Sequence, residues 1–276
     1  MTEASLDDFA GTLVLLGAGK MGGAMLEGWR RLGLKFDNAA VIEPQPTPEI
    51  MALGQRGLRI NPALDMVAAN AIVVAVKPQI APQVLPTLAR QVRDDTVVIS
   101  IMAGRTLGFL EKTLPANAAV VRAMPNTPAS IGRGITVAVP NARVSKPQRE
   151  LTDKLLRATG AVEWVADESL MDAVTAVSGS GPAYVFLLAE SLARAGAAAG
   201  LPADLAARLA RATVAGAGEL LHRSALDAAT LRQNVTSPGG TTAAALDVLM
   251  SPAGLDPVME RAVAAATRRG RELAGA

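Results

Sequence analysis

The chain has 276 residues; half are hydrophobic, only 3% are aromatic, and the formal net charge is +2. This length suits one large or two ordinary domains, with a core built from aliphatic side chains. The sequence has no Cys and a single His, His222, which excludes disulfides, thiolate nucleophiles and multi-histidine or zinc–thiolate metal sites. We therefore predict no metal, and the small net charge indicates no nucleic-acid partner.

The amino-terminal residues, MTEASLDDFA, lack the basic and apolar segments of a secretory signal. The longest uncharged run, residues 173–189, contains Ser-Gly-Ser-Gly-Pro, and its continuous apolar part is too short to span a bilayer. We therefore expect a cytoplasmic protein without a membrane segment.

The first expected element is a buried strand, Leu13–Leu16, followed by a G-x-G-x-x-G motif and a helix. Strand, glycine turn and helix arrive in the order that a dinucleotide site requires. Gly17 should permit the tight turn, Gly19 should leave room for a pyrophosphate, and Gly22 should let the helix pack closely. The motif comprises Gly17, Ala18, Gly19, Lys20, Met21 and Gly22.

A second apolar run, Ala39–Ile42, ends at Glu43. Glu43 lies about twenty residues past the glycine motif, where an acidic side chain accepts hydrogen bonds from the adenosine ribose. A glycine-rich turn without a ligand is the alternative, and the strand, helix and carboxylate around the motif favour the nucleotide site.

Apolar strands alternate with helical segments up to about residue 165, which predicts a mainly parallel sheet covered on both faces. Ligands in such folds bind beyond the carboxyl ends of the strands, so Lys77-Pro78, Ala103-Gly104 and Met124–Thr127 are candidate site segments. The further expected strands are Leu58–Ile60, Ala71–Val76, Thr96–Ile101, Ala118–Arg122, Ile135–Val139 and Ala161–Val165.

From about residue 167 only helices are expected. The fold class is therefore an α/β Rossmann-type dinucleotide-binding domain, residues 1–166, followed by an all-α domain, residues 167–276. The helical half is rich in Ala and Gly and poor in charge, which favours a homodimer through this half over a purely internal core. The expected helices are Asp167–Val177, Pro182–Ala199, Pro202–Arg223, Asp227–Asn234, Gly239–Met250 and Leu255–Ala274.

Two glycine-rich turns open helices in this half: residues 178–182, SGSGP, and residues 235–242, VTSPGGTT. In the second turn, hydroxyls and free amides converge without a competing charge, which suits a small carboxylate. Ordinary helix capping by Ser237 is the alternative. We interpret His222 as an exposed residue at a helix end and Tyr184 as a packing residue.

Five motifs, GAGKMG, AVKPQ, RAMPNTP, TAVSGSGPAYVF and NVTSPGGTTAAAL, occur in this order, and the whole chain thereby resembles the pyrroline-5-carboxylate reductase family. The resemblance implies hydride transfer from NADPH or NADH to the C=N bond of 1-pyrroline-5-carboxylate. The product is L-proline, in the last step of proline biosynthesis. It also implies an amino-terminal Rossmann domain and helical domains that interlock into dimers, which often assemble into decamers.

The resemblance also assigns roles to residues. Gly17 to Gly22 would hold the pyrophosphate, and Thr242 would be the catalytic residue that hydrogen-bonds the ring nitrogen. Cofactor contacts elsewhere would come from Ala75, Lys77, Pro78, Ala103 and Asn234, and from Glu168 of the partner chain. The substrate carboxylate would be held by Ser237, Gly239, Gly240 and Thr241.

The sequence after Ile42, Glu43-Pro44-Gln45-Pro46, offers a carboxylate and no Arg. A carboxylate repels a 2′-phosphate, so these residues favour NADH, unless Glu43 points away from the ribose. A β-hydroxyacid dehydrogenase is the alternative enzyme, but its catalytic Lys has no counterpart between residues 173 and 194. A nucleotide-sensing scaffold is the non-enzyme alternative, and it would not need the Ser237–Thr242 turn.

Overall fold

The computed structural model describes residues 5–63 and 68–275. The chain divides into two compact units. The first comprises residues 1–179 together with residues 267–276, and the second comprises residues 180–266. The segment 167–179 thus packs with the sheet-containing unit, while the domain boundary at residues 166 and 167 stays a prediction.

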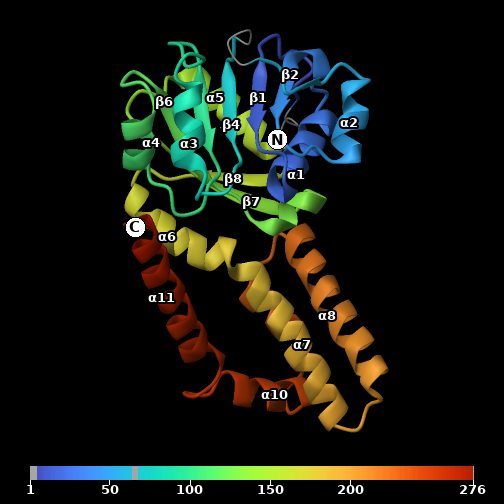
Figure 1. Ribbon diagram of the computed structural model, residues 1–276. Helices are drawn as coiled ribbons and strands as arrows, with labels where there is room; N and C mark the ends of the chain where they lie inside the picture. Colours follow the sequence, from blue (N-terminus) through green and yellow to red (C-terminus); the bar gives the residue numbers. More distant parts are fainter. Residues whose placement is uncertain (1–4, 64–67, 276) are drawn as a thin grey trace. The chain divides into compact units, whose positions relative to one another are not determined.

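An eight-stranded sheet forms the centre of the first unit, in the order β3-β2-β1-β4-β5-β6-β7-β8 (Figure 1). All neighbouring strands are parallel except β6 and β7, which confirms the mainly parallel sheet. The bounds of β1 and β2 are as expected, and the other strands differ by one or two residues at their ends. The strands are β1 (Leu13–Leu16), β2 (Ala39–Ile42), β3 (Arg59–Ile60), β4 (Ala71–Val74), β5 (Val97–Ser100), β6 (Ala119–Met124), β7 (Gly134–Pro140) and β8 (Gly160–Trp164).

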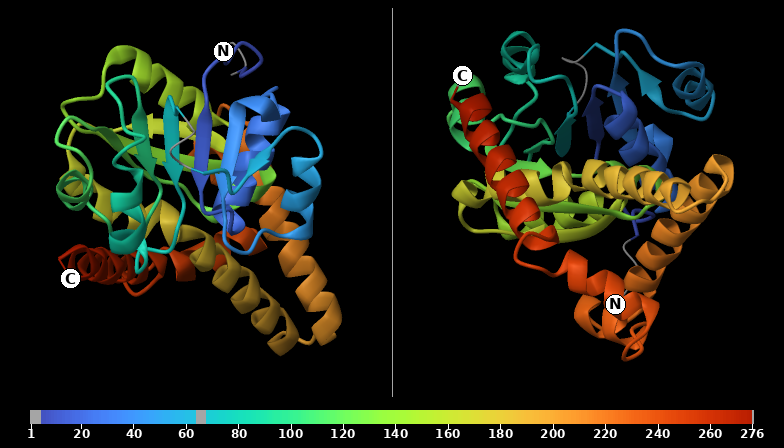
Figure 2. Two further views of the ribbon diagram at one scale, coloured as in Figure 1. Left: turned by 45° about the horizontal axis from the view of Figure 1, so that its top comes forward. Right: turned by 90° about the horizontal axis from the view of Figure 1, so that it is seen from below.

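Helices cover both faces of this sheet (Figure 2). Alternate residues of β1 enter different cores, because successive side chains of a strand point to opposite faces. Leu13 and Leu15 pack with the cluster that contains Trp29, whereas Val14 and Leu16 pack with the other. The helices of this unit are α1 (Lys20–Arg31), α2 (Pro48–Gly54), α3 (Ala81–Val84), α4 (Leu107–Thr113), α5 (Lys146–Arg157) and α6 (Met171–Val174).

Helices α1 and α5 approach each other closely on one face of the sheet. A Cβ atom at Gly28 would lie 2.4 Å from the carbonyl oxygen of Ala158, so only glycine fits there. Beside this contact, the indole Nε1 of Trp29 donates a hydrogen bond of 2.8 Å to the carbonyl of Leu155. This bond satisfies a polar group that is otherwise fully buried.

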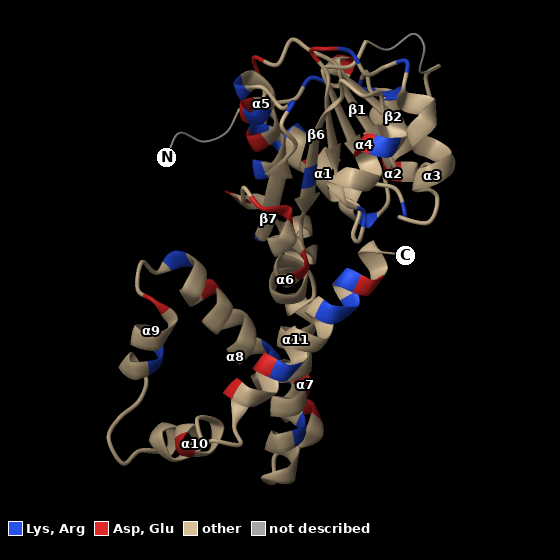
Figure 3. Ribbon diagram, turned by 90° about the vertical axis from the view of Figure 1, so that its left-hand side faces the viewer, with Lys and Arg blue, Asp and Glu red and all other residues tan. Residues whose placement is uncertain are grey.

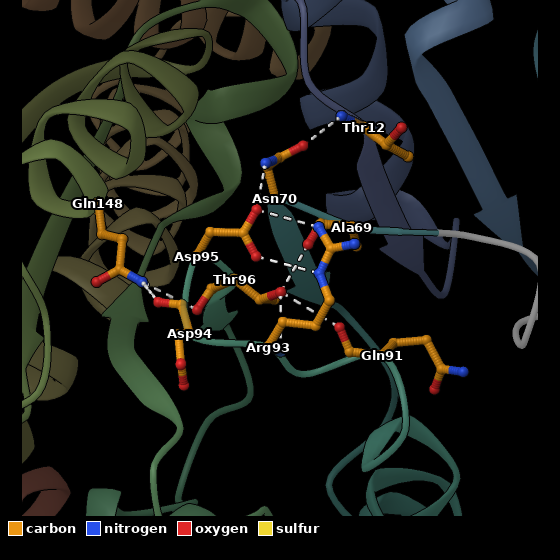
Figure 4. Close-up of polar contacts among 9 residues, drawn as sticks. All are labelled: Thr12, Ala69, Asn70, Gln91, Arg93, Asp94, Asp95, Thr96 and Gln148. Carbon is orange, nitrogen blue, oxygen red and sulfur yellow. Dashed lines mark hydrogen bonds and ion pairs between the residues drawn. The ribbon is translucent and has the colours of Figure 1, made fainter.

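A polar network closes the amino-terminal end of the sheet, opposite the edge where ligands bind (Figure 4). The side chain of Asn70 accepts from the Thr12 amide and donates to Asp95. The buried hydroxyl of Thr96 donates to the carbonyl of Ala69, and Gln148 of α5 donates to the carbonyl of Thr96. These bonds link the strand starts to one another and to α5.

The segment expected as one helix, Asp167–Val177, is broken in the structure. It forms a 3-10 turn, Glu168–Leu170, then α6, and then a π-helical turn, Thr175–Gly179. The prediction of one continuous α-helix was therefore wrong, because the hydrogen-bond pattern changes twice within the segment. A Cβ atom at Gly179 would lie 2.6 Å from the Cε of Met124, so the π turn ends against the last residue of β6.

The second unit is helical and buries very little. Of residues 180–266, only Ala206 and Ala210 are buried. No helix in residues 5–63 and 68–275 combines the length and apolar character that a membrane crossing requires. The helices here are α7 (Gly181–Ala198), α8 (Ala203–Arg223), α9 (Ala228–Asn234), α10 (Thr241–Leu249) and α11 (Leu255–Ala274), whose last turns belong to the first unit.

A largely buried ion pair ties the 3-10 turn Glu168–Leu170 to the sheet. Arg122 of β6 donates to Glu168 at 2.8 Å, and their side chains are 5% and 28% exposed. The same carboxylate oxygen accepts from the amide of Leu107 at 2.7 Å, at the first turn of α4. One carboxylate thus joins a strand, a helix start and the segment that leads towards the second unit.

Replacing one partner of this pair should destabilise the first unit. We expect Arg122→Met to lower its free energy of unfolding by about 3 kcal/mol, because the carboxylate stays partly buried without its cation. Urea unfolding followed by tryptophan fluorescence measures this, since both Trp29 and Trp164 lie in this unit. Lys146→Ala is the control, because its ion pair with Glu150 is exposed, and it should change stability by less than about 0.5 kcal/mol.

Candidate active site

The strand order reverses direction between β1 and β4, which lie side by side. Ligands bind at such a switch point, beyond the carboxyl ends of the strands. Two hydrogen bonds continue the pairing past the strand ends. The amide of Ala75 donates to Leu16 at 2.8 Å, and the amide of Gly17 donates to Ile42 at 2.9 Å. The residues Gly17–Gly22, which we call the glycine loop, and Ala75 therefore begin side by side, directly after their strands.

The glycine loop is shaped by contacts that exclude larger side chains. Gly17 has a φ of +88°, and a Cβ atom there would lie 2.8 Å from the carbonyl oxygen of Ala75. A Cβ atom at Gly22 would lie 2.2 Å from the carbonyl oxygen of Gly17. The tight turn and the close packing expected of these two glycines are present, with Gly22 packing on the loop itself. A Cβ atom at Gly19 would meet no heavy atom within 4 Å.

Helix α1 begins at this loop and presents free backbone donors. Its amino-terminal cap is Gly19, which has no side chain to occupy the first-turn amides. The first turn contains no acidic residue, and Arg30 and Arg31 lie in the last turn. A helix start of this kind attracts a phosphate through its amides and its dipole.

Glu43 turns towards the glycine loop. One carboxylate oxygen accepts from the amide of Ala18 at 2.9 Å, and the other accepts from the amide of Gln45 at 3.1 Å. Each oxygen keeps a lone pair for a further donor. Beside the loop lies a pocket of about 370 Å³, and its lining includes Ala18, Gly19, Lys20, Thr47, Glu49 and Ile50.

The two loops after β4 and β5 are tied together by Arg105. Its Nε and Nη2 donate to the carbonyl of Pro78 at 3.1 and 2.9 Å, and its guanidinium lies 4.5 Å from the ring centroid of Phe109. The candidates Lys77 and Ala103 are exposed on either side of this link. Sequence reasoning missed Arg105, because an acceptor on a distant backbone leaves no signal in the sequence.

Glu168 has partners within its own chain. Its carboxylate accepts from Arg122 and from the amide of Leu107, as described above. These bonds give it a structural role in the first unit. Its contact with the cofactor of a partner chain stays a prediction.

The turn before α10 has a geometry that suits an anion. Gly239 adopts a φ of +69°, and Gly240 is the amino-terminal cap of α10, with no side-chain capping bond. Capping by Ser237, the alternative from the sequence, is therefore absent. Asn234 ends α9 and is exposed.

Three hydroxyls of this turn have no partner in the described part of the chain. Within the described part of the chain, no hydrogen bond engages the side chains of Ser237, Thr241 and Thr242. The hydroxyl of Thr236, in contrast, donates to the carbonyl of Arg232 at 2.7 Å. His222 lies exposed in the last turn of α8, as the sequence indicated.

The fold and the glycine loop define a dinucleotide-binding protein, and comparison with known proteins places it among the oxidoreductases. The family model described as NADP oxidoreductase, coenzyme F420-dependent, matches residues 12–104. The model described as pyrroline-5-carboxylate reductase dimerisation matches residues 168–273.

Individual relatives name the family. Pyrroline-5-carboxylate reductases of Pseudomonas aeruginosa and Mycobacterium leprae are 37% and 40% identical, each over 95% of this chain and 96% of the relative. A solved pyrroline-5-carboxylate reductase from Coxiella burnetii superposes with a TM-score of 0.88 at 33% identity, over 95% of this chain and 98% of that one. The chain belongs to the pyrroline-5-carboxylate reductase family.

Two glycines of the G-x-G-x-x-G motif should respond differently to a methyl group. Gly19→Ala should keep the Tm and raise the Kd for NADH about tenfold or more, since its Cβ meets no protein atom but stands where a pyrophosphate approaches. Gly22→Ala should lower the Tm, because its Cβ collides with the carbonyl of Gly17. Calorimetric unfolding and titration measure the two effects.

Gly108→Ala on α4 is the control, because its Cβ would lie 3.9 Å from the nearest atom, the hydroxyl oxygen of Thr106, and Gly108 is not among the residues that line the pocket beside the glycine loop. It should leave both quantities nearly unchanged. A wild-type NADH affinity in Gly19→Ala would contradict the placement of the pyrophosphate.

Proposed function

We propose that this chain transfers a hydride from NADH or NADPH to the C=N bond of 1-pyrroline-5-carboxylate and forms L-proline, the last step of proline biosynthesis. Similarity to pyrroline-5-carboxylate reductases over 95% of the chain carries the proposal. Family membership separates the chain from the β-hydroxyacid dehydrogenases, the alternative that the first motif left open.

The residues of the glycine loop fit a dinucleotide. Gly17, Gly19 and Gly22 leave the loop backbone and the first turn of α1 accessible to a pyrophosphate. Ala75, Lys77, Pro78 and Ala103 would line the nicotinamide half, in loops that Arg105 holds together. Asn234, and Glu168 of a partner chain, would complete the cofactor contacts.

Glu43 supports NADH as the preferred cofactor. Its carboxylate faces the glycine loop, where it can accept from ribose hydroxyls and repel a 2′-phosphate. No basic residue follows it in the Pro44-Gln45-Pro46 segment. A solved relative from Plasmodium falciparum, 30% identical, is described with NADP bound.

The substrate is a cyclic imine that carries a carboxylate. The amides at the start of α10, with Ser237, Gly239, Gly240 and Thr241, would hold that carboxylate. Thr242 would hydrogen-bond the ring nitrogen and so fix the orientation of the C=N bond.

The reaction requires little acid–base catalysis by protein side chains. The protonated imine is already an electrophile, and the nicotinamide cofactor supplies the hydride when bound. A hydroxyl that orients the ring and amides that fix the carboxylate are then sufficient, and the rate comes mostly from positioning. This agrees with a chain that has no Cys and one exposed His.

The second unit supports a homodimer through the carboxy-terminal helices. Large apolar side chains such as Phe186, Leu220 and Val248 are 63%, 62% and 70% exposed. Figure 3 shows few charged residues on α7 and α10. Apolar helices without a core of their own need a partner surface. Assembly into a decamer is a further expectation from the resemblance.

The activity is tested by following nicotinamide absorbance with purified protein and 1-pyrroline-5-carboxylate. We expect oxidation with both cofactors and a higher kcat/KM with NADH. No oxidation with either cofactor would overturn the proposal.

In the same assay, Thr242→Val should lower kcat about 100-fold while the Kd for NADH stays near the wild-type value, because only the ring contact is lost. Thr236→Val is the control in the same turn, since its hydroxyl is already used by the carbonyl of Arg232. It should retain most of the turnover. Equal kcat in wild type and Thr242→Val would remove this hydroxyl from the mechanism.

The dimer surface is tested by charge insertion. Phe186→Asp should shift the protein towards monomer in size-exclusion chromatography with light scattering, because an aspartate cannot be buried in an apolar interface without a partner. Met51→Asp is the control, since Met51 is 52% exposed on α2 of the first unit. It should elute as the wild type does.

A further inference from the structure

Asn61 holds an unusual backbone conformation directly after β3. It is the one non-glycine residue with positive φ in the described part of the chain, at +48°. Few residue types tolerate this left-handed region, and asparagine is one of them. Its own amide donates to the carbonyl of Val41 at 2.8 Å, so the parallel pairing of β3 with β2 continues to Asn61.

The side chain of Asn61 holds the backbone of Glu43 through two hydrogen bonds, which we call the clamp. Its Oδ1 accepts from the Glu43 amide at 2.9 Å, and its Nδ2 donates to the Glu43 carbonyl at 3.0 Å. These two bonds use both backbone polar groups of Glu43. They therefore fix the position from which the carboxylate projects.

The carboxylate of Glu43 connects the clamped residue to the glycine loop by hydrogen bonds. One oxygen accepts from the amide of Ala18, and the other accepts from the amide of Gln45. Three strand ends are linked in this way: Asn61 after β3, Glu43 after β2 and Ala18 after β1. The sequence shows Glu43 as a candidate, but it gives no sign that Asn61 supports it.

We propose that Asn61 is a positioning residue that determines the preference between NADH and NADPH by fixing Glu43 against the glycine loop. This inference rests on the proposed function. A held carboxylate can accept from the ribose 2′-hydroxyl and repels a 2′-phosphate at short range. A carboxylate that moves into solvent does neither, because water replaces the hydroxyl and screens the charge.

The first measurement is the Kd for NADH and for NADPH, by calorimetric titration of the purified protein. Asn61→Gly keeps the positive φ and removes the clamp. We expect it to weaken NADH binding by about threefold to tenfold, the factor that one or two ordinary hydrogen bonds carry. NADPH binding should stay the same or tighten, so the selectivity ratio falls towards that of Glu43→Ala.

A double-mutant cycle separates this effect from a general loss of structure. Adding Asn61→Gly to Glu43→Ala should change the selectivity ratio no further, because the carboxylate through which Asn61 acts is gone. Asn38→Ala is the matched control. It removes an asparagine amide that donates to the carbonyl of Phe9 at the opposite end of β2, and it should leave the ratio unchanged.

A second readout needs no nucleotide. The amide of Ala18 should exchange with deuterium several-fold faster in Asn61→Gly than in the wild type, because its acceptor is no longer held, and we expect the same in Glu43→Ala, where the acceptor is absent. If Asn61→Gly does not fold, Asn61→Asp serves instead. It keeps the acceptor for the Glu43 amide but places a negatively charged oxygen, in place of the donor, against the Glu43 carbonyl, so Ala18 should exchange at a rate between the wild type and Glu43→Ala.

The outcomes distinguish the inference from the proposed function. An unchanged selectivity ratio and wild-type exchange at Ala18 would overturn the role of Asn61 and leave the reductase proposal intact. Parallel weakening of both nucleotides in Asn61→Gly would likewise overturn it, as a purely structural effect. If the wild-type protein binds neither nucleotide, the proposed function itself fails, and the inference with it.

Discussion

The close approach of the glycine loop to the neighbouring strand end is the constraint on which the candidate cofactor site depends. Gly17 can turn only because it has no side chain facing Ala75, and the first turn of α1 can pack on the loop only because Gly22 has no side chain facing Gly17. This packing leaves the first amides of α1 uncovered at the switch point of the sheet. The rest of the first unit, with cores on both faces of the sheet and a polar network at its far end, holds these backbone segments in place.

Side chains bonded to distant backbone groups then refine the geometry of the loops. Arg105 donates a hydrogen bond to the carbonyl of Pro78, and Glu168 accepts one from the amide of Leu107. Asn61 accepts a hydrogen bond from the amide of Glu43 and donates one to its carbonyl. In each case a polar side chain from one segment satisfies the backbone of another, so the site is built largely from main-chain atoms. This suits a reaction in which the protein positions the reactants and supplies little acid–base chemistry.

Much of the fold could be predicted from local sequence patterns, because buried parallel strands are continuous apolar runs and helices are periodic. The bounds of β1 and β2 were predicted, and so was the turn of Gly17. The π turn at Thr175–Gly179 could not be, because one extra residue in a helical turn leaves the apolar pattern almost intact, and its contact with Met124 is long-range. Asn61 and Arg105 were missed for the same reason, since their acceptors lie far away in the sequence.

The scarcity of buried side chains in the second unit has a consequence for how the protein responds to dilution. Residues 180–266 bury only two alanines, which supply too little apolar area to offset the conformational entropy of α7 to α10 and most of α11. In the proposed dimer, association supplies the missing free energy, and mass action then couples folding to protomer concentration. The melting temperature should rise with protein concentration, and the enzyme should lose activity when it is diluted below the dissociation constant of its subunits, with the Rossmann unit still folded.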